Sequence, residues 1–160
     1  MRVVIDAMGG DHAPAVVVDG AVQAARELGI EIIFVGQRDV VEFELSRFET
    51  TGLSLAVHHA SEVISMDEHN PAAAVKAKRD SSMVVGTELV KRREADAFVT
   101  AGHSGGALAA ALFRLGRIRG IKRPALSTVF PSENPQGHCF LLDIGANAVC
   151  KPEYLLQFAI

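Results

Sequence analysis

Residues 3–12 read Val3-Val4-Ile5-Asp6-Ala7-Met8-Gly9-Gly10-Asp11-His12, an apolar strand that runs straight into a polar loop with two glycines. Pro14 then opens an Ala- and Val-rich run that is typical of a helix. Glycine lets backbone N–H groups approach a ligand closely, and a helix N-terminus adds partial positive charge, so this junction predicts an anion site. The structural alternative makes Asp11 a helix cap and leaves Asp6 solvated at the rim of the strand.

Apolar runs of strand length alternate with segments of helical period along the rest of the chain. We expect strands at residues 3–5, 32–35, 53–57, 97–100, 126–130 and 139–144, and helices at 14–28, 40–48, 71–78 and 82–93, with an Ala-rich helix that ends at 115 and a last one opened by Pro152. This alternation predicts an α/β fold with a parallel, doubly wound sheet and right-handed crossovers.

Composition indicates a globular protein. With 160 residues, of which 49% are hydrophobic, we expect one α/β domain over residues 1–160. The net charge of −3 argues against nucleic-acid binding by bulk electrostatics. Cys139 and Cys150 have no metal or redox spacing, and no secretory leader is evident, which favours a reducing cytoplasm. Because no apolar run approaches the roughly 18 residues of a membrane span, any membrane contact is expected to be peripheral.

The motifs of the common cofactor sites are missing from the sequence. Neither the Gly-rich dinucleotide fingerprint nor the P-loop pattern occurs, so nucleotide binding is not supported. His58-His59 has no carboxylates nearby at ligand spacing, and we expect no metal site. We therefore expect no cofactor.

The last residues, Phe158-Ala159-Ile160, read as the middle of an apolar helix. Domains usually end in polar residues, so this ending predicts that the working protein continues or that a partner covers this face. The alternative is that the terminal helix packs onto the core.

Three expected strands end in polar loops that contain glycine. These loops are Asp6–His12, Gly102–Gly106 and Asp143–Asn147. Ligands of open α/β sheets bind beyond the carboxyl ends of the strands, so we expect the three junctions to meet at one edge.

The middle junction, Gly102-His103-Ser104-Gly105-Gly106, fits the G-x-S-x-G pattern of hydrolase nucleophiles. Ser104 is therefore a candidate nucleophile, but the only downstream histidine is His138, and Glu133 lies too close to it in the chain for a usual triad. The glycines suit a second role, in which the Ser104 hydroxyl and nearby N–H groups hold a phosphate or an oxyanion. A structural reading makes Ser104 a helix cap.

Basic residues are concentrated between Arg114 and Arg123, with no acid among them. Cations at a helix C-terminus complement its dipole, yet this density exceeds that need and favours an acidic partner or a phosphate-bearing substrate. Lys91-Arg92-Arg93 is followed by Glu94 and is read as a solvated helix end.

Seven clusters follow one another in a recognisable order: residues 5–14, Ser81-Ser82-Met83 with Gly86, then 95–97, 101–107, 123–126, 142–147 and 150–152. Their order and spacing closely resemble the bacterial phosphate acyltransferase family (phosphate:acyl-ACP acyltransferase, PlsX), over nearly the whole chain. The resemblance implies that inorganic phosphate attacks the thioester of an acyl-acyl carrier protein and gives acyl phosphate for phospholipid and fatty acid metabolism. It also implies a Rossmann-like α/β/α sandwich with a mostly parallel sheet, akin to the phosphotransacetylase and isopropylmalate dehydrogenase-like group. A homodimer and peripheral contact with a membrane or a membrane acyltransferase are further implications.

Two departures from the family pattern stand out. His103 occupies a position where the family typically has Asn, so an imidazole replaces an amide in that loop. Family members are also about twice as long, so the chain corresponds to their N-terminal half.

Phosphate is already a nucleophile at neutral pH and a thiolate leaves readily, so the implied reaction needs a positioning cradle and oxyanion donors rather than a triad. The candidate catalytic residues are His12, Ser104, Asn147 and Lys151, with His12 assisting proton transfer. The candidate phosphate-binding residues are Gly9, Gly10, Asp11, Gly102, His103 and Gly105. The candidate contacts with acyl carrier protein are Arg114, Arg117, Arg119, Lys122 and Arg123. A serine hydrolase that uses Ser104 and a catalytically incomplete half-protein remain the alternatives.

Overall fold

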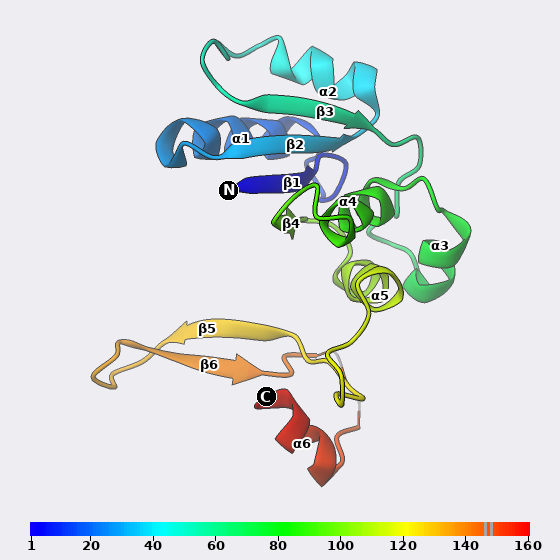
Figure 1. The fold of residues 1–160 in the computed structure, drawn as a ribbon, viewed down its shortest axis with the longest axis vertical. Coiled ribbons are helices and arrows are strands. Elements are labelled where there is room, and N and C mark those ends of the chain that lie inside the picture. The colour runs from blue at the N-terminus through cyan, green and yellow to red at the C-terminus, as the bar shows by residue number, and fades with distance from the viewer. Residues whose placement is uncertain (146, 148) are drawn as a thin grey trace. The chain divides into compact units, whose positions relative to one another are not determined.

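The computed structural model describes residues 1–145, 147 and 149–160. These residues form two compact units, Met1–Gly116 and Arg117–Ile160. The ribbon in Figure 1 follows the chain through both units.

A four-stranded parallel sheet forms the centre of the first unit. Its strands are β1 (Arg2–Asp6), β2 (Glu31–Gly36), β3 (Leu55–His59) and β4 (Ala97–Val99), in the order β3-β2-β1-β4. In the register, Val4 of β1 lies opposite Ile33 of β2 and Phe98 of β4. The parallel sheet expected from the βαβα alternation is confirmed for these strands.

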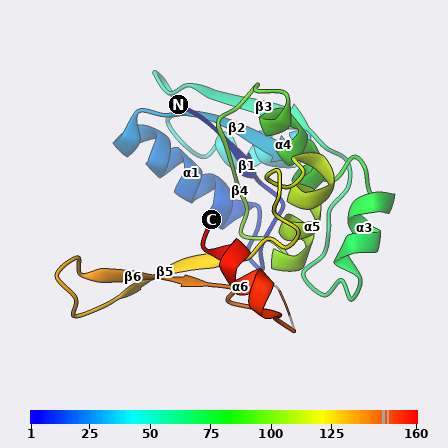
Figure 2. The ribbon, with the colours of Figure 1, turned by 60° about the horizontal axis from the view of Figure 1, so that its bottom comes forward.

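Helices cover both faces of this sheet, because side chains along a strand point alternately to opposite faces. Ile32 and Phe34 pack with α1 (Ala15–Leu28) and α2 (Arg38–Leu45) in one apolar cluster. Val35 packs on the other face, in a cluster that contains Leu89 of α4 (Ser82–Lys91). Figure 2 shows α1 and α4 on opposite sides of the strands, so the sheet is doubly wound as predicted.

Two more helices extend the face that carries α4. They are α3 (Pro71–Ala77) and α5 (Ser104–Arg114), and they share an apolar cluster with α4 that includes Val75, Met83 and Ala110. Met83 lies between the two outer helices and is 1% exposed. This packing holds the N-terminus of α5 next to the sheet.

Local signals explain several boundaries. Gly29 ends α1 in the left-handed conformation, with φ of 61°, and its N–H donates to Ala25 O. The side chain of Asn70 caps α3 by accepting a hydrogen bond from Ala73 N at 3.1 Å, and Pro71 occupies the first turn. Both devices were expected from the sequence, because glycine favours C-caps while Asn followed by Pro favours N-termini.

Some expected boundaries differ from the structure. The second helix spans 38–45 instead of 40–48, because Phe48 N bonds to Leu45 O in a tighter turn. The third strand lies two residues later than expected, at Leu55–His59. Ser81 occupies the N-cap position of α4, but its hydroxyl donates to Lys78 O instead of capping the helix.

The second unit contains a hairpin and a short helix. Strands β5 (Ser127–Pro131) and β6 (His138–Leu142) pair antiparallel in a sheet of their own. The connection 132–137 is a turn and is too short for the crossover that parallel strands need, so these strands depart from the parallel arrangement. Helix α6 (Pro152–Phe158) begins after Lys151, as expected, and none of its described side chains is buried.

Across the described part of the chain, no helix combines the length and the apolar character needed to cross a membrane.

The hairpin of the second unit is expected to be the least protected strand pair. Every residue of β6 is exposed, whereas Val4 of β1 is completely buried. Because an isolated hairpin is only marginally stable, amides of β5 and β6 should exchange with solvent at least about a hundredfold faster than those of β1. Hydrogen exchange measured by NMR checks this, and equal protection of the two strand pairs would contradict it.

Candidate functional site

The loops that follow β1 and β4 pack against each other. These two strands are parallel neighbours, so their carboxyl ends meet at one edge. A Cβ added to Gly102 would lie 3.2 Å from Gly9 Cα, and one added to Gly10 would lie 3.3 Å from Ala101 O. Gly10 also has φ of 117°, a conformation that favours glycine. The structure therefore brings together two of the three glycine junctions, as the sequence predicted.

A chain of hydrogen bonds connects the two loops. The Asp6 side chain, 1% exposed, accepts a hydrogen bond from Thr100 Oγ1 at 2.8 Å and from Met8 N at 3.2 Å. Thr100 Oγ1 in turn accepts from Gly102 N at 2.9 Å. Asp6 is therefore a buried connecting residue, and the solvated strand-end alternative is wrong.

Thr100 is the functional-site residue that the sequence reasoning missed. It is the residue just before the Ala101-Gly102 junction, and its hydroxyl serves both Asp6 and the following loop. Its position could have been inferred from the sequence, because Thr100 follows one expected strand and Asp6 ends another, and a hydroxyl can donate to a carboxylate at the same sheet edge.

His103 caps α5. Its Nδ1 accepts a hydrogen bond from Gly106 N at 3.3 Å, so Nε2 carries the proton and donates to Glu68 O at 3.1 Å. The imidazole thus fills the cap role, and the structural alternative in which Ser104 caps this helix is wrong. Asn, which the related family typically has here, caps helices in the same way through its side-chain oxygen.

Ser104 is exposed as the first residue of α5. Among the described residues, its hydroxyl bonds to no histidine and to no carboxylate. The ring nitrogens of the adjacent His103 both have other partners. The described part of the chain therefore holds no Ser-His-acid arrangement around Ser104.

Several backbone N–H groups at this edge are open to a ligand. Those of Gly10, Ser104 and Gly105 donate to no other described residue. The N–H groups of Gly102 and Gly106 are engaged inside the loop. Because the first N–H groups of a helix attract anions, these donors make this side of the junction a candidate anion site.

The remaining glycines of these loops have packing roles. A Cβ added to Gly105 would lie 3.0 Å from Pro71 Cγ of α3. At Gly106 it would lie 3.0 Å from Met83 Sδ of α4. Gly105 therefore combines a free N–H with a close approach to α3.

Asp11 and His12 lie exposed in the loop between Gly10 and α1. Pro14 occupies the N-cap position of α1 without a side-chain hydrogen bond, so the structural alternative in which Asp11 caps this helix is wrong. His12 uses its backbone carbonyl, which accepts from Val16 N at 3.4 Å. The residue is exposed, two positions after Gly10 in the same loop.

The third junction, Asp143–Asn147, belongs to the second unit, and Ala146 within it lies outside the described residues. Asn147 Nδ2 donates to Asp143 Oδ1 at 3.0 Å and to Pro124 O at 3.1 Å. Its amide therefore stabilises the loop. Lys151 is exposed at the N-cap of α6.

The basic run Arg114–Arg123 is divided between the units. Arg114 ends α5, whereas the other four cations belong to the second unit. Arg117 Nη1 donates to Lys122 O at 2.7 Å, and the Arg123 guanidinium lies 5.4 Å from the centre of the Tyr154 ring. The residues from Arg117 to Arg123 thus form a locally ordered basic segment.

No group of three or more potential metal ligands occurs among the described residues.

The comparisons with known proteins agree with one another. The family described as "Fatty acid synthesis protein" matches residues 1–160. The chain is 55% identical over 159 residues to the phosphate acyltransferase of Herpetosiphon aurantiacus, covering 99% of this chain and 42% of that protein. It is 52% identical to the phosphate acyltransferase of Geobacter sulfurreducens, covering 100% of this chain and 45% of that protein. The chain thus spans about half the length of the curated relatives it matches.

Solved structures show the same fold. A phosphotransacetylase from Streptococcus pyogenes superposes with a TM-score of 0.70 at 22% identity, over 99% of this chain and 51% of that one. The EutD phosphotransacetylase from Staphylococcus aureus superposes with a TM-score of 0.66 at 17% identity, over 99% of this chain and 50% of that one. The expected fold group is confirmed.

Gly9→Ala is expected to destabilise the protein. The new Cβ would lie 2.6 Å from Asp6 Oδ2 and 2.7 Å from Thr100 Oγ1, so the buried carboxylate could move away only by straining its hydrogen bonds to Thr100 and Met8. We expect a loss of about 1–3 kcal/mol in the free energy of unfolding, measured by urea denaturation. The matched control is Gly20→Ala in α1, where a Cβ meets nothing within 4 Å and should stabilise the helix by about 0.5–1 kcal/mol. A Gly9→Ala protein as stable as the parent would contradict the prediction.

Asp143→Asn is expected to make Cys150 more reactive. The Cys150 thiol donates to Asp143 Oδ2 at 3.0 Å, and this hydrogen bond to a carboxylate raises the pKa of the thiol. Removing the charge lowers that pKa, so more thiolate is present at neutral pH and alkylation by iodoacetamide should accelerate at least about twofold. Cys139, also free and exposed, is the internal control. An unchanged rate at Cys150 would be evidence against the interaction.

Proposed function

Because this chain belongs to the fatty acid synthesis protein family, we propose that it serves in phosphate acyltransfer. Inorganic phosphate and acyl-ACP are the substrates, and acyl phosphate and free carrier protein are the products used in phospholipid synthesis. Support comes from the relatives, which are named phosphate acyltransferase and match this chain along its whole length.

The reaction needs positioned donors more than an activated nucleophile. A phosphate oxygen attacks the thioester carbonyl carbon and forms a tetrahedral oxyanion. The carbon–sulfur bond then breaks, and the thiolate leaves with the electron pair and takes up a proton. Charge develops on the carbonyl oxygen during the attack, so fixed N–H groups aimed at that oxygen stabilise the transition state.

The paired loops at the ends of β1 and β4 are the observation that carries this proposal. Gly9 and Gly102 approach closely enough that the open N–H groups of Gly10, Ser104 and Gly105 line one edge of the sheet. The N-terminus of α5 adds its dipole to these donors, an arrangement suited to phosphate. Asp11 contributes its backbone in this arrangement, since its carboxylate repels an anion.

The other candidate residues receive more limited roles. His12 is exposed beside the first loop, where its imidazole can donate the proton that the leaving thiolate requires. Gly102 and His103 position the loop through their hydrogen bonds to Thr100, Gly106 and Glu68. In the second unit, Asn147 positions its loop and Lys151 pairs with an anionic oxygen.

The proposal also includes a carrier protein, a second copy of the chain and a membrane contact. The basic residues Arg117, Arg119, Lys122 and Arg123 would receive the acidic acyl carrier protein, because opposite charges steer association. A homodimer in the cytoplasm, with peripheral contact to a membrane or a membrane acyltransferase, completes the proposed arrangement.

Phosphate-dependent trapping tests this function. The protein is incubated with acyl-ACP, phosphate and hydroxylamine, and the acyl hydroxamate formed is measured with and without phosphate. We expect hydroxamate to require phosphate and to persist in Ser104→Ala within about tenfold of the parent, because the hydroxyl assists binding without acting as nucleophile.

The alternatives give different results in the same assay. Phosphate-independent release of free fatty acid, abolished by Ser104→Ala, would overturn the proposal in favour of a serine hydrolase. If neither acyl phosphate nor free fatty acid forms, the result would favour the catalytically incomplete half-protein. Gly20→Ala is the control for a substitution by Ala outside the glycine junctions, since a Cβ added there meets nothing within 4 Å, and it should leave the phosphate dependence unchanged.

A further inference from the structure

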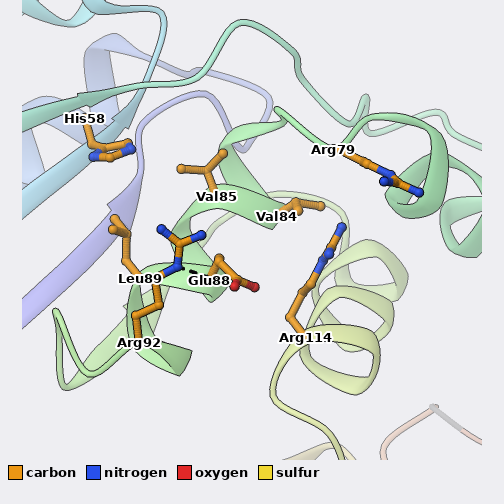
Figure 3. A pocket seen from close by; sticks show the side chains of 8 residues that line it. All are labelled: His58, Arg79, Val84, Val85, Glu88, Leu89, Arg92 and Arg114. Carbon is orange, nitrogen blue, oxygen red and sulfur yellow. Dashed lines mark ion pairs between the residues drawn. The ribbon is translucent and has the colours of Figure 1, made fainter.

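A hollow lined by arginines lies on the helical side of the first unit, apart from the glycine loops. Its volume is about 300 Å³, and its lining residues are His58, Arg79, Val84, Val85, Glu88, Leu89, Arg92 and Arg114. In Figure 3, Arg92, which follows α4, and Arg114, the last residue of α5, lie on either side of Glu88. The hollow shares no lining residue with the junctions described above.

The charge of this hollow is unbalanced. Three guanidinium groups face a single carboxylate, Glu88, which pairs with Arg92 Nε at 3.5 Å. Glu88 is the single carboxylate among the lining residues, so the three arginines leave the lining with two uncompensated positive charges. An excess of two positive charges matches a dianion better than a single carboxylate.

Arg114 supplies an independent indication of a ligand. Its Nε is buried, yet it meets no hydrogen-bond acceptor among the described residues. Buried donors are almost always satisfied, and leaving a charged one without a partner costs free energy. A bound anion would supply the missing acceptor, and the guanidinium fork fits phosphate oxygens in particular.

The hollow also has an apolar part, which consists of Val84, Val85 and Leu89. Arg79 and Arg114 also line a neighbouring hollow of about 450 Å³, where Lys76 Nζ lies 4.8 Å from the centre of the Phe113 ring. The cations thus lie between two partly apolar spaces. This combination suits a molecule that carries a charged group on an apolar body.

We propose that this arginine-lined hollow binds an organic phosphate, with its phosphoryl group held by Arg79 and Arg114 and its apolar body against the valine and leucine wall. Arg92 is exposed at the C-cap of α4, as the predicted solvated helix end requires, and it also lines this hollow. Arg114, which the sequence suggested as a carrier-protein contact, lines the hollow as well. The site is independent of the proposed acyltransfer, which rests on the glycine loops.

Phenyl phosphate and inorganic phosphate are suitable probes, because the first adds an apolar ring to the second. Their dissociation constants are measured by calorimetry, and the Nε–H signal of Arg114 is followed by NMR in ¹⁵N-labelled protein. We expect phenyl phosphate to shift the Arg114 signal saturably and to bind more tightly than inorganic phosphate. Arg114→Gln and Arg79→Gln should each weaken its binding at least about tenfold.

Lys91→Gln is the matched control, since it removes one positive charge from the exposed end of α4 without touching the hollow. It should leave binding unchanged. An unmoved Arg114 signal, or equal weakening by Lys91→Gln, would overturn the site. Inorganic phosphate that binds as tightly as phenyl phosphate would overturn the assignment to an organic ester. Arg79 is exposed, so Arg79→Gln keeps the test decisive should Arg114→Gln unfold.

Discussion

The buried carboxylate of Asp6 at the end of β1 constrains everything around the candidate site. A carboxylate this deeply buried requires hydrogen-bond donors, and Met8 N and Thr100 Oγ1 supply them. Thr100 also orders the backbone at Gly102. Gly9 must lack a side chain, because a Cβ would contact both the carboxylate and the hydroxyl. One interaction thus fixes the relative position of two loops that are far apart in the sequence.

The His103 cap has a second, local consequence. By satisfying Gly106 N and bonding to Glu68 O, the ring fixes where α5 begins. The N–H groups of Ser104 and Gly105, at the start of this helix, donate to no other described residue. The site therefore offers oriented donors rather than an activated serine. Such a site suits a reaction whose nucleophile, phosphate, is a co-substrate.

Much of the fold could be predicted because its signals are local. Gly29, Asn70 with Pro71, and Lys151 with Pro152 mark helix ends by backbone preferences that act within a few residues. The ends of α2 and β3 were less predictable, because their residues suit more than one conformation and packing decides between them. The hairpin at β5 and β6 follows from its short connection, whereas the alternation pattern alone suggested more parallel strands.

The sequence by itself determined the doubly wound parallel sheet and the meeting of the first two glycine junctions, because the carboxyl ends of parallel strands share an edge. Only the tertiary structure decided which side chains hold that edge together. Thr100 reaches Asp6 across 94 residues, and His103 reaches Glu68 across 35. Likewise, Arg114 is close to Arg117 in the sequence, yet it lines a hollow with Arg79 and Arg92. Such pairings depend on how separate helices and strands pack, and no local preference of the chain encodes them.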